Sequence, residues 1–382
     1  MIVRSTIRLL SVVSLSVCAA LSLASCASTG KPDQVAYSPA ELRSEAERRV
    51  MNARPGEIIV PYQVTPELVA RAQELTRYIR SEYDAARALI EAVTDENQFG
   101  LKYQATATAP ADETVLRGYG NCLALTSVFI GLARGIGLEV YYIDASDRVN
   151  EIRRELEIIV DSGHIAAVTR TERGWTMVDF AGELPNYRTF RVIDDLTVLA
   201  HYYNNRGYEI IDEASQSGQE VPWDQVRRSF DIATKVRPGF SLAHNNLGVL
   251  NAQAGQDEAA ERAYLSAIDA DPNFAAPYHN LGNLKLSQGE LDDAIVAYDE
   301  AIRIKTKNPY LHYHRGLALY RQGQLEEAAA AFERAISLKR DYVEPRNLLA
   351  QTYDKLGRHE DAERVRKSVR GLLSQHRQES SL

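Results

Sequence analysis

Residues 282–301 read GNLKLSQGELDDAIVAYDEA, and residues 316–335 read GLALYRQGQLEEAAAAFERA. The two stretches begin 34 residues apart, and glycine, alanine and aromatic residues hold equivalent places in both. The same spacing relates further positions along the chain: Gly248, Gly282, Gly316 and Ala350; Gly255, Gly289, Gly323 and Gly357; Ala260, Ala294, Ala328 and Ala362; and Tyr264, Tyr298 and Phe332. Small residues let two helices cross closely, and the aromatic residue is expected to fill the gap to the next repeat. The sequence therefore predicts a stack of paired antiparallel helices in the C-terminal half.

This spacing and these residue types resemble the tetratricopeptide repeat, or TPR. Phe230 falls in phase one period before Tyr264, which indicates an atypical leading repeat that begins near Leu196. In the last repeat Arg366 takes the place of the aromatic residue, as expected for a cap that faces solvent. The predicted boundaries are 196–239 for the leading repeat, 240–375 for four TPR repeats and 376–382 for a tail.

A repeat stack of this kind has a concave face, and residues on successive first helices are expected to line it. The candidates are Asn245, His279, Tyr313 and Asn347, again 34 residues apart. Amide, imidazole and phenol groups can hydrogen-bond an extended backbone, so the expected partner is a protein or peptide. The alternative is a generic hydrated surface without a ligand.

The N-terminal segment is interpreted as a targeting signal. Arg4 and Arg8 precede an apolar run, Leu9 to Leu23, which is too short for a stable membrane span and leads directly into polar sequence. The small residues before Cys26 resemble the lipobox of bacterial lipoproteins, in which the cysteine is lipidated and becomes the new N-terminus. An ordinary cleaved signal peptide and an uncleaved anchor are the alternatives. The predicted boundaries are 1–25 for the signal peptide and 26–40 for a tether.

Cleavage before Cys26 would remove two arginines and no acidic residue, which changes the formal charge from −8 to −10. By analogy with lipoproteins, Ala27 after the cysteine favours the outer membrane, with the protein facing the periplasm. Of the three cysteines, Cys18 would leave with the signal and Cys26 would carry lipid. Cys122 would then stand alone in an oxidising compartment, either as a small buried residue or as a reactive thiol.

The sequence around Cys122 predicts a helix followed by strands. Apolar residues from Leu125 to Ile136 follow the helical template, and Gly137 ends the helix. Strands are expected at Leu138 to Ile143, His164 to Arg170 and Trp175 to Phe180. If Arg170 pairs with Trp175 across the hairpin, His164 and Asp179 are diagonal neighbours on one face of the sheet. A slip of one residue would place them on opposite faces.

Residues 103–179 resemble the core of the transglutaminase-like superfamily. The matching pieces are Gly120-Asn121-Cys122-Leu123-Ala124-Leu125, Gly163-His164-Ile165-Ala166 and Gly174-Trp175-Thr176-Met177-Val178-Asp179. The resemblance implies an α+β, papain/transglutaminase-like domain, placed at 41–195, ahead of the all-α TPR solenoid. It also implies a nucleophilic Cys122, a proton-shuttling His164 and an orienting Asp179. Activities in the superfamily include hydrolysis of peptides and amides and acyl transfer.

The residue chemistry favours the same roles. A cysteine at a helix N-terminus is stabilised as thiolate by backbone N–H groups and by the helix dipole. A neighbouring imidazole can take its proton, and a carboxylate behind the imidazole fixes the tautomer. Tyr119, Asn121 and Gln104 are candidates for a further oxyanion contact.

Each of these residues also has a structural interpretation, because isolated cysteines and histidines are often packed core groups. His201 is the rival histidine, and packing between domains explains it better. Asp194 and Asp195 are interpreted as a helix start.

No metal site, cofactor motif or long basic run is recognisable, so neither a metal, a cofactor nor a nucleic-acid partner is expected. Two functions remain. The first is a membrane-anchored cysteine hydrolase or acyltransferase whose TPR module binds a protein or peptide. The second is a non-catalytic envelope scaffold in which the repeats bind proteins and the cysteine domain is structural.

Overall fold

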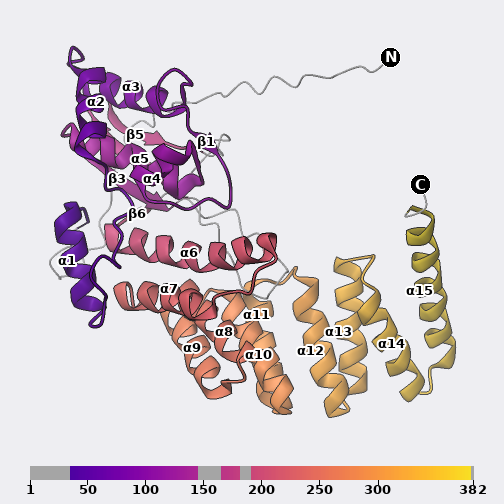
Figure 1. Cartoon of the computed structure of the whole chain (residues 1–382). Coiled ribbons are helices and arrows are strands. Elements are labelled where there is room, and N and C mark those ends of the chain that lie inside the picture. The colour runs from indigo at the N-terminus through magenta and orange to yellow at the C-terminus, as the bar shows by residue number, and fades with distance from the viewer. Residues whose placement is uncertain (1–34, 145–164, 181–190, 380–382) are drawn as a thin grey trace, which may run out of the picture. The chain divides into compact units, whose positions relative to one another are not determined.

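The structure is a computed structural model that describes residues 35–144, 165–180 and 191–379. The chain divides into two compact units, Met1–Phe240 and Ser241–Leu382. The first unit mixes helices with a small sheet, and the second is helical throughout its described residues (Figure 1). None of the described helices is both long enough and apolar enough to cross a membrane.

The sheet of the first unit has four strands in the order β5-β4-β3-β6, and all neighbours are antiparallel. The strands are β3 (Val140–Asp144), β4 (Ile165–Thr171), β5 (Gly174–Val178) and β6 (Arg191–Ile193). Arg170 pairs with Trp175, which confirms the expected register of the hairpin. β6 was not predicted, because three residues are too few to show an alternating pattern.

Helix α5 (Cys122–Gly135) packs on this sheet and is the central element of the unit. Eleven consecutive residues of α5, from Leu123 to Ala133, are buried. Tyr142 of β3 donates a hydrogen bond to Ser127 of α5 over 2.8 Å, and Phe129 packs against Phe180 with ring centroids 6.2 Å apart. A helix that is apolar on every side is expected where neighbours surround it.

Three helices pack against α5: α2 (Pro66–Thr76), α3 (Glu82–Thr94) and α4 (Ala111–Arg117). Helix α1 (Pro39–Arg49) packs instead against the helices Asp195–Ser217 and Trp223–Val236. Thr65 caps α2, and Pro66 is its first residue. Two short parallel strands, β1 (Lys102–Tyr103) and β2 (Tyr119–Gly120), bring the segment after α3 beside the segment that leads into Cys122.

A buried ion pair ties the C-terminal end of α5 to α6 (Asp195–Ser217). Arg134 donates to both carboxylate oxygens of Asp195, over 2.7 Å and 3.0 Å, and its guanidinium lies 4.6 Å from the centre of the Tyr62 ring. Asp195 also accepts from the backbone N–H of Tyr37 over 2.9 Å. Removing one partner of such a buried pair typically costs about 3–5 kcal/mol, because the other charge stays buried.

Asp194 caps α6, as expected, by accepting from the backbone of Thr197 over 2.7 Å. α6 packs against α7 (Trp223–Val236), and a Cβ at Gly207 would lie 2.5 Å from the Phe230 ring. The corresponding contacts in the second unit are Gly248 with Tyr264, Gly282 with Tyr298 and Gly316 with Phe332. The pair α6–α7 therefore has the glycine–aromatic contact of the repeats.

The second unit is a series of helix hairpins. Its helices are α8 (Ser241–Gln253), α9 (Asp257–Ala270), α10 (Ala275–Gln288), α11 (Leu291–Ile304), α12 (Pro309–Gln322), α13 (Leu325–Leu338), α14 (Val343–Lys355) and α15 (His359–Glu379). Gly289 and Gly323 end α10 and α12 with φ of 79° and 86°, where a residue with a side chain would be strained. The predicted α+β domain followed by an all-α solenoid is confirmed.

Candidate functional site

Cys122 is the first residue of α5, and it is half-buried. Asn121 is the helix cap: its side-chain Oδ1 accepts from the backbone N–H of Ala124 over 3.0 Å. This places the sulfur at the end of the helix where backbone N–H groups are exposed, as the sequence predicts. Cys122 is the only cysteine among the described residues.

The electrostatic balance at Cys122 differs from the expectation of a stabilised thiolate. Burial raises the pKa of the Cys122 thiol above its ordinary value, and the nearby Asp179 carboxylate also raises it. Backbone hydrogen bonds from Ile165 and Leu123 lower the pKa and only partly offset the burial. The helix N-terminus acts in the expected direction, but loss of hydration is the larger effect.

Asp179 directly follows β5 and is half-buried. The register pairs Ala167 with Val178, so Asp179 takes the position across from Ala166. Its charge acts on the Cys122 sulfur, so the two side chains belong to one electrostatic neighbourhood. The structure thus brings together two of the three predicted catalytic residues.

His164, the third predicted catalytic residue, lies outside the described residues. Ile165, which follows it in the chain, is described. The Ile165 backbone hydrogen-bonds the Cys122 sulfur, and its carbonyl accepts from Thr126 of α5 over 3.3 Å. The start of β4 is therefore in contact with the first turns of α5, the helix that begins at Cys122.

The rival histidine, His201, is buried in α6 and stacks edge-on against Phe240, with ring centroids 4.6 Å apart. Burial lowers the pKa of His201 to about 4, although the Asp144 carboxylate opposes this shift. The imidazole is therefore neutral at pH 7 and is held by packing, in agreement with its structural interpretation.

The three candidates for a further oxyanion contact differ in their surroundings. Asn121 is buried and uses both ends of its amide, because Nδ2 donates to Thr108 Oγ1 over 2.6 Å while Oδ1 caps α5. Tyr119 and Gln104 are exposed. Asn121 therefore has a structural task that its sequence position alone did not reveal.

Thr108 was not predicted to take part in the site. It is buried, its hydroxyl accepts from Asn121, and its backbone N–H donates to Glu209 of α6. Thr108 lies in the irregular segment between β1 and α4, where the sequence has no periodic pattern from which its neighbours could be inferred.

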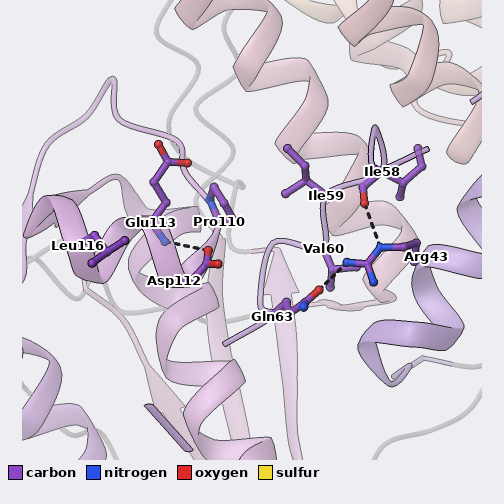
Figure 2. A pocket seen from close by; sticks show the side chains of 10 residues that line it. Arg43, Ile58, Ile59, Val60, Gln63, Pro110, Asp112, Glu113 and Leu116 are labelled. Carbon is purple, nitrogen blue, oxygen red and sulfur yellow. Dashed lines mark hydrogen bonds between the residues drawn. The ribbon is translucent and has the colours of Figure 1, made fainter. Parts of the chain in front are cut away.

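A pocket of about 400 Å³ lies elsewhere in the first unit, between α1, residues 56–63 and the start of α4 (Figure 2). Arg43 donates to the Ile58 carbonyl over 3.3 Å on one side of it, while Asp112 and Glu113 stand on the other. Neither Cys122 nor Asp179 lines this pocket, so it is not the predicted catalytic site.

The predicted groove residues of the repeats have different environments. Asn245 is fully buried, and its Oδ1 accepts from Asn280 over 2.9 Å, so the prediction that it lines an open surface is wrong. Its amide joins neighbouring first helices instead. Asn347 is exposed, whereas His279 and Tyr313 are half-buried.

Both half-buried residues belong to an aromatic cluster around His314. The ring centroids of His279 and Tyr313 each lie 5.0 Å from the ring centroid of His314. Burial lowers the pKa of His279 to about 3 and that of His314 to about 4, so both imidazoles are neutral at pH 7. This cluster can offer hydrogen bonds and aromatic faces but no positive charge at that pH.

Comparison with known families agrees with both halves of the chain. The model of the transglutaminase-like superfamily matches residues 69–180. Models of the tetratricopeptide repeat match residues 223–273, 263–296, 282–323 and 316–357. No curated protein matches the chain.

Several solved structures are similar to the chain. MamA 41-end from Desulfovibrio magneticus RS-1 has 16% identity and a TM-score of 0.41, over 46% of this chain and 96% of that one. A crystal structure of MamA has 22% identity and a TM-score of 0.39, over 45% and 96% of the two chains. YrrB, described as a TPR protein with an unusual peptide-binding site, has 15% identity and a TM-score of 0.39, over 46% and 88%.

Proposed function

The chain carries a transglutaminase-like domain followed by several TPR repeats, and from this premise we propose that it is a membrane-anchored cysteine hydrolase or acyltransferase. Its substrates are peptide or amide bonds, and its repeats bind a protein or peptide partner. Lipid on Cys26 is the proposed anchor, in a bacterial envelope and facing the periplasm.

The observation that carries the proposal is the environment of one sulfur. Cys122 begins a buried helix, the backbone of Ile165 hydrogen-bonds its sulfur, and Asp179 is close enough to influence its pKa. The residue before Ile165 is the predicted base, His164. A cysteine at a helix N-terminus, with a histidine as its base and an aspartate that orients the histidine, is a set of groups that can carry out acyl transfer.

In the proposed reaction, His164 accepts the thiol proton and the Cys122 sulfur attacks the carbonyl carbon of the substrate. The tetrahedral intermediate then collapses, the C–N bond breaks, and His164 returns the proton to the departing amine. Water or a second amine attacks the resulting thioester and releases Cys122. Asp179 holds the imidazole in the tautomer that this cycle requires.

The raised pKa of the Cys122 thiol places a requirement on this mechanism. A thiol whose neighbours leave it protonated needs a base at the moment of attack or an imidazolium partner that offsets the burial. The reactivity of Cys122 should therefore depend strongly on His164.

We expect iodoacetamide to label Cys122 of the folded protein at pH 7 faster than it labels a model thiol, with the site identified by mass spectrometry. His164→Ala should slow the labelling about tenfold or more, within the range that a positioned base contributes. His201→Gln is the matched control, because it alters a neutral imidazole outside the predicted triad and should leave the rate unchanged. Labelling no faster than that of the model thiol, or indifferent to His164→Ala, would contradict the enzymatic proposal.

The raised pKa also favours the second candidate function, a non-catalytic scaffold in which Cys122 is only a packed residue. In that case Cys122→Ala would leave the function of the protein in its native organism intact at a normal protein level. Loss of function in the same variant would exclude the scaffold.

A further inference from the structure

A buried chain of hydrogen bonds runs from α6 to the first turn of the cysteine helix. It passes through three residues that lie far apart in the sequence: Glu209, Thr108 and Asn121. Their exposed fractions are 4%, 1% and 5%, so water is not available to satisfy their polar atoms. Such groups are costly to bury, and each must find its partners within the protein.

Three contacts join these residues in order. The Glu209 carboxylate accepts from the backbone N–H of Thr108. The Thr108 hydroxyl in turn accepts from Asn121 Nδ2 over 2.6 Å. The amide of Asn121 is thereby oriented, so that its oxygen faces the backbone N–H of Ala124 and caps α5.

The Asn121 cap stands directly beside the proposed nucleophile. If its amide turned over, Nδ2 would meet the Ala124 N–H, and the first turn of α5 would lose its side-chain acceptor. Cys122 is the first residue of that turn, and the alignment of its backbone N–H groups affects the thiolate. The orientation of one amide therefore affects the chemistry of the sulfur.

Burial raises the pKa of Glu209 to about 7, against the opposing effect of its hydrogen bonds from Thr108 and of Arg206. Arg206 donates to Glu209 over 3.1 Å and to Glu213 over 3.2 Å. A buried carboxyl at this position carries a desolvation cost that packing alone does not require, since a neutral side chain would fill the same space.

We infer that Glu209 and Thr108 are positioning residues for Cys122, acting through the Asn121 cap. This inference rests on the proposed function, because it assigns the two residues to the same site. Neither residue touches the substrate. Their role is to fix the geometry of the first turn of α5, where the sulfur lies.

The test uses the full-length protein and the rate of iodoacetamide labelling of Cys122 between pH 5 and 10, from which an apparent thiol pKa is obtained. Thr108→Val keeps the shape of the side chain and removes the hydroxyl, whereas Thr108→Ser keeps the hydroxyl. We expect Thr108→Val to raise the apparent thiol pKa and to slow labelling at pH 7 about three- to tenfold, as loss of a cap and its dipole alignment would do. Thr108→Ser should restore the wild-type profile to within about twofold, since it keeps the acceptor.

Glu209→Gln provides a second variant, because a neutral amide accepts from the Thr108 backbone N–H more weakly than a carboxylate does. It should shift the profile in the same sense as Thr108→Val. Glu213→Gln is its control: it removes another acidic partner of Arg206 on α6 without a contact to Thr108. Wild-type profiles in both Thr108→Val and Glu209→Gln, or equal effects of Thr108→Val and Thr108→Ser, would overturn the inference.

The outcome is separable from that of the proposed function. A slow, His164-independent thiol in the wild-type protein would contradict the enzymatic proposal, but its apparent pKa can still be compared between variants. A fast, His164-dependent thiol that is indifferent to Thr108 and Glu209 would leave the enzyme standing and remove their positioning role. If Glu209→Gln does not fold, the comparison of Thr108→Val with Thr108→Ser decides.

Discussion

At the scale of single residues, the candidate site depends on what lies beside each titratable group. The position of Cys122 at the start of a helix could be predicted from the sequence, whereas the direction of its pKa shift could not. Burial is the larger effect, and burial depends on chain segments far away in the sequence. The same holds for Glu209, whose partner Thr108 is 101 residues distant.

Glu209 should make the stability of the protein depend on pH. Its pKa is about 7 in the folded protein, against an ordinary value of 4.5, and its side chain is only 5% exposed. The folded state therefore binds this proton more tightly than the unfolded state does, so stability falls as the pH rises through the folded pKa. Between pH 5 and 8 we expect a loss of roughly 2–3 kcal/mol from this group.

Urea unfolding at several pH values gives the free energy of unfolding of the wild type and of Glu209→Gln as a function of pH. The difference between the two slopes is the contribution of Glu209. Glu209→Gln should lose less stability over that interval. Glu213, which is 62% exposed, serves as the control, because Glu213→Gln should retain the wild-type dependence. Parallel curves for wild type and Glu209→Gln would contradict the assigned pKa.

At the scale of elements, the hairpin β4–β5 and the helix α5 were predictable because each has a period that its sequence displays. The register assumed for the hairpin, with Arg170 opposite Trp175, is the one observed. The strands β1, β2 and β6 escaped prediction, because elements of two or three residues carry no period. His164 remains a predicted site residue outside the described part of the chain.

The repeats show both the strength and the limit of a periodic pattern. A spacing of 34 residues predicted the helix pairs, whereas the contact of each aromatic residue with the glycine of its own pair was not predicted. It also suggested that Asn245 lies on an open face, where the structure buries it. Equivalent positions share a backbone geometry, but their exposure also depends on the neighbouring side chains, here Asn280.

The packing of α5 leads to a prediction about two of its glycines. A Cβ at Gly131 would lie 2.4 Å from the backbone carbonyl of Tyr62, which cannot move without displacing its segment. A Cβ at Gly135 would instead meet a methyl group of Val69 at 2.9 Å, and that side chain can shift. Gly131→Ala should therefore destabilise the protein by about 1–3 kcal/mol, despite the better helix propensity of alanine.

Gly135→Ala is the matched control on the same helix. Its gain in helix propensity should roughly offset the adjustment of Val69, so its free energy of unfolding should remain within about 1 kcal/mol of the wild type. Chemical denaturation of the two variants provides the comparison. Equal stabilities would show that the segment around Tyr62 yields as easily as a side chain.

At the scale of the whole molecule, the chain combines a domain with candidate acyl-transfer chemistry and a stack of helix pairs suited to binding. The two compact units are consistent with separate tasks, one chemical and one of recognition. In the proposal, the lipid on Cys26 confines both tasks to a membrane surface.

The anchor can be tested with two cysteine substitutions. Cys26→Ser should release the protein from the membrane fraction of a bacterial host and abolish incorporation of a fatty-acid label, because only a thiol accepts the lipid. Cys18→Ser should leave both unchanged, since that residue lies inside the predicted signal segment. Membrane retention and labelling of Cys26→Ser would contradict lipidation at this position.

Helix α6 is linked to both ends of α5. Asp195 binds Arg134 near the last turn of α5, and Glu209 reaches its cap through Thr108. The two spans match, because 13 residues from Asn121 to Arg134 and 14 from Asp195 to Glu209 each cover about 20 Å of helix. α6 thus holds α5 at both of its ends. If α6 moved along its axis, both links would move together and α5 would keep its position relative to α6. If α6 tilted, one of the two links would be stretched while the other was not.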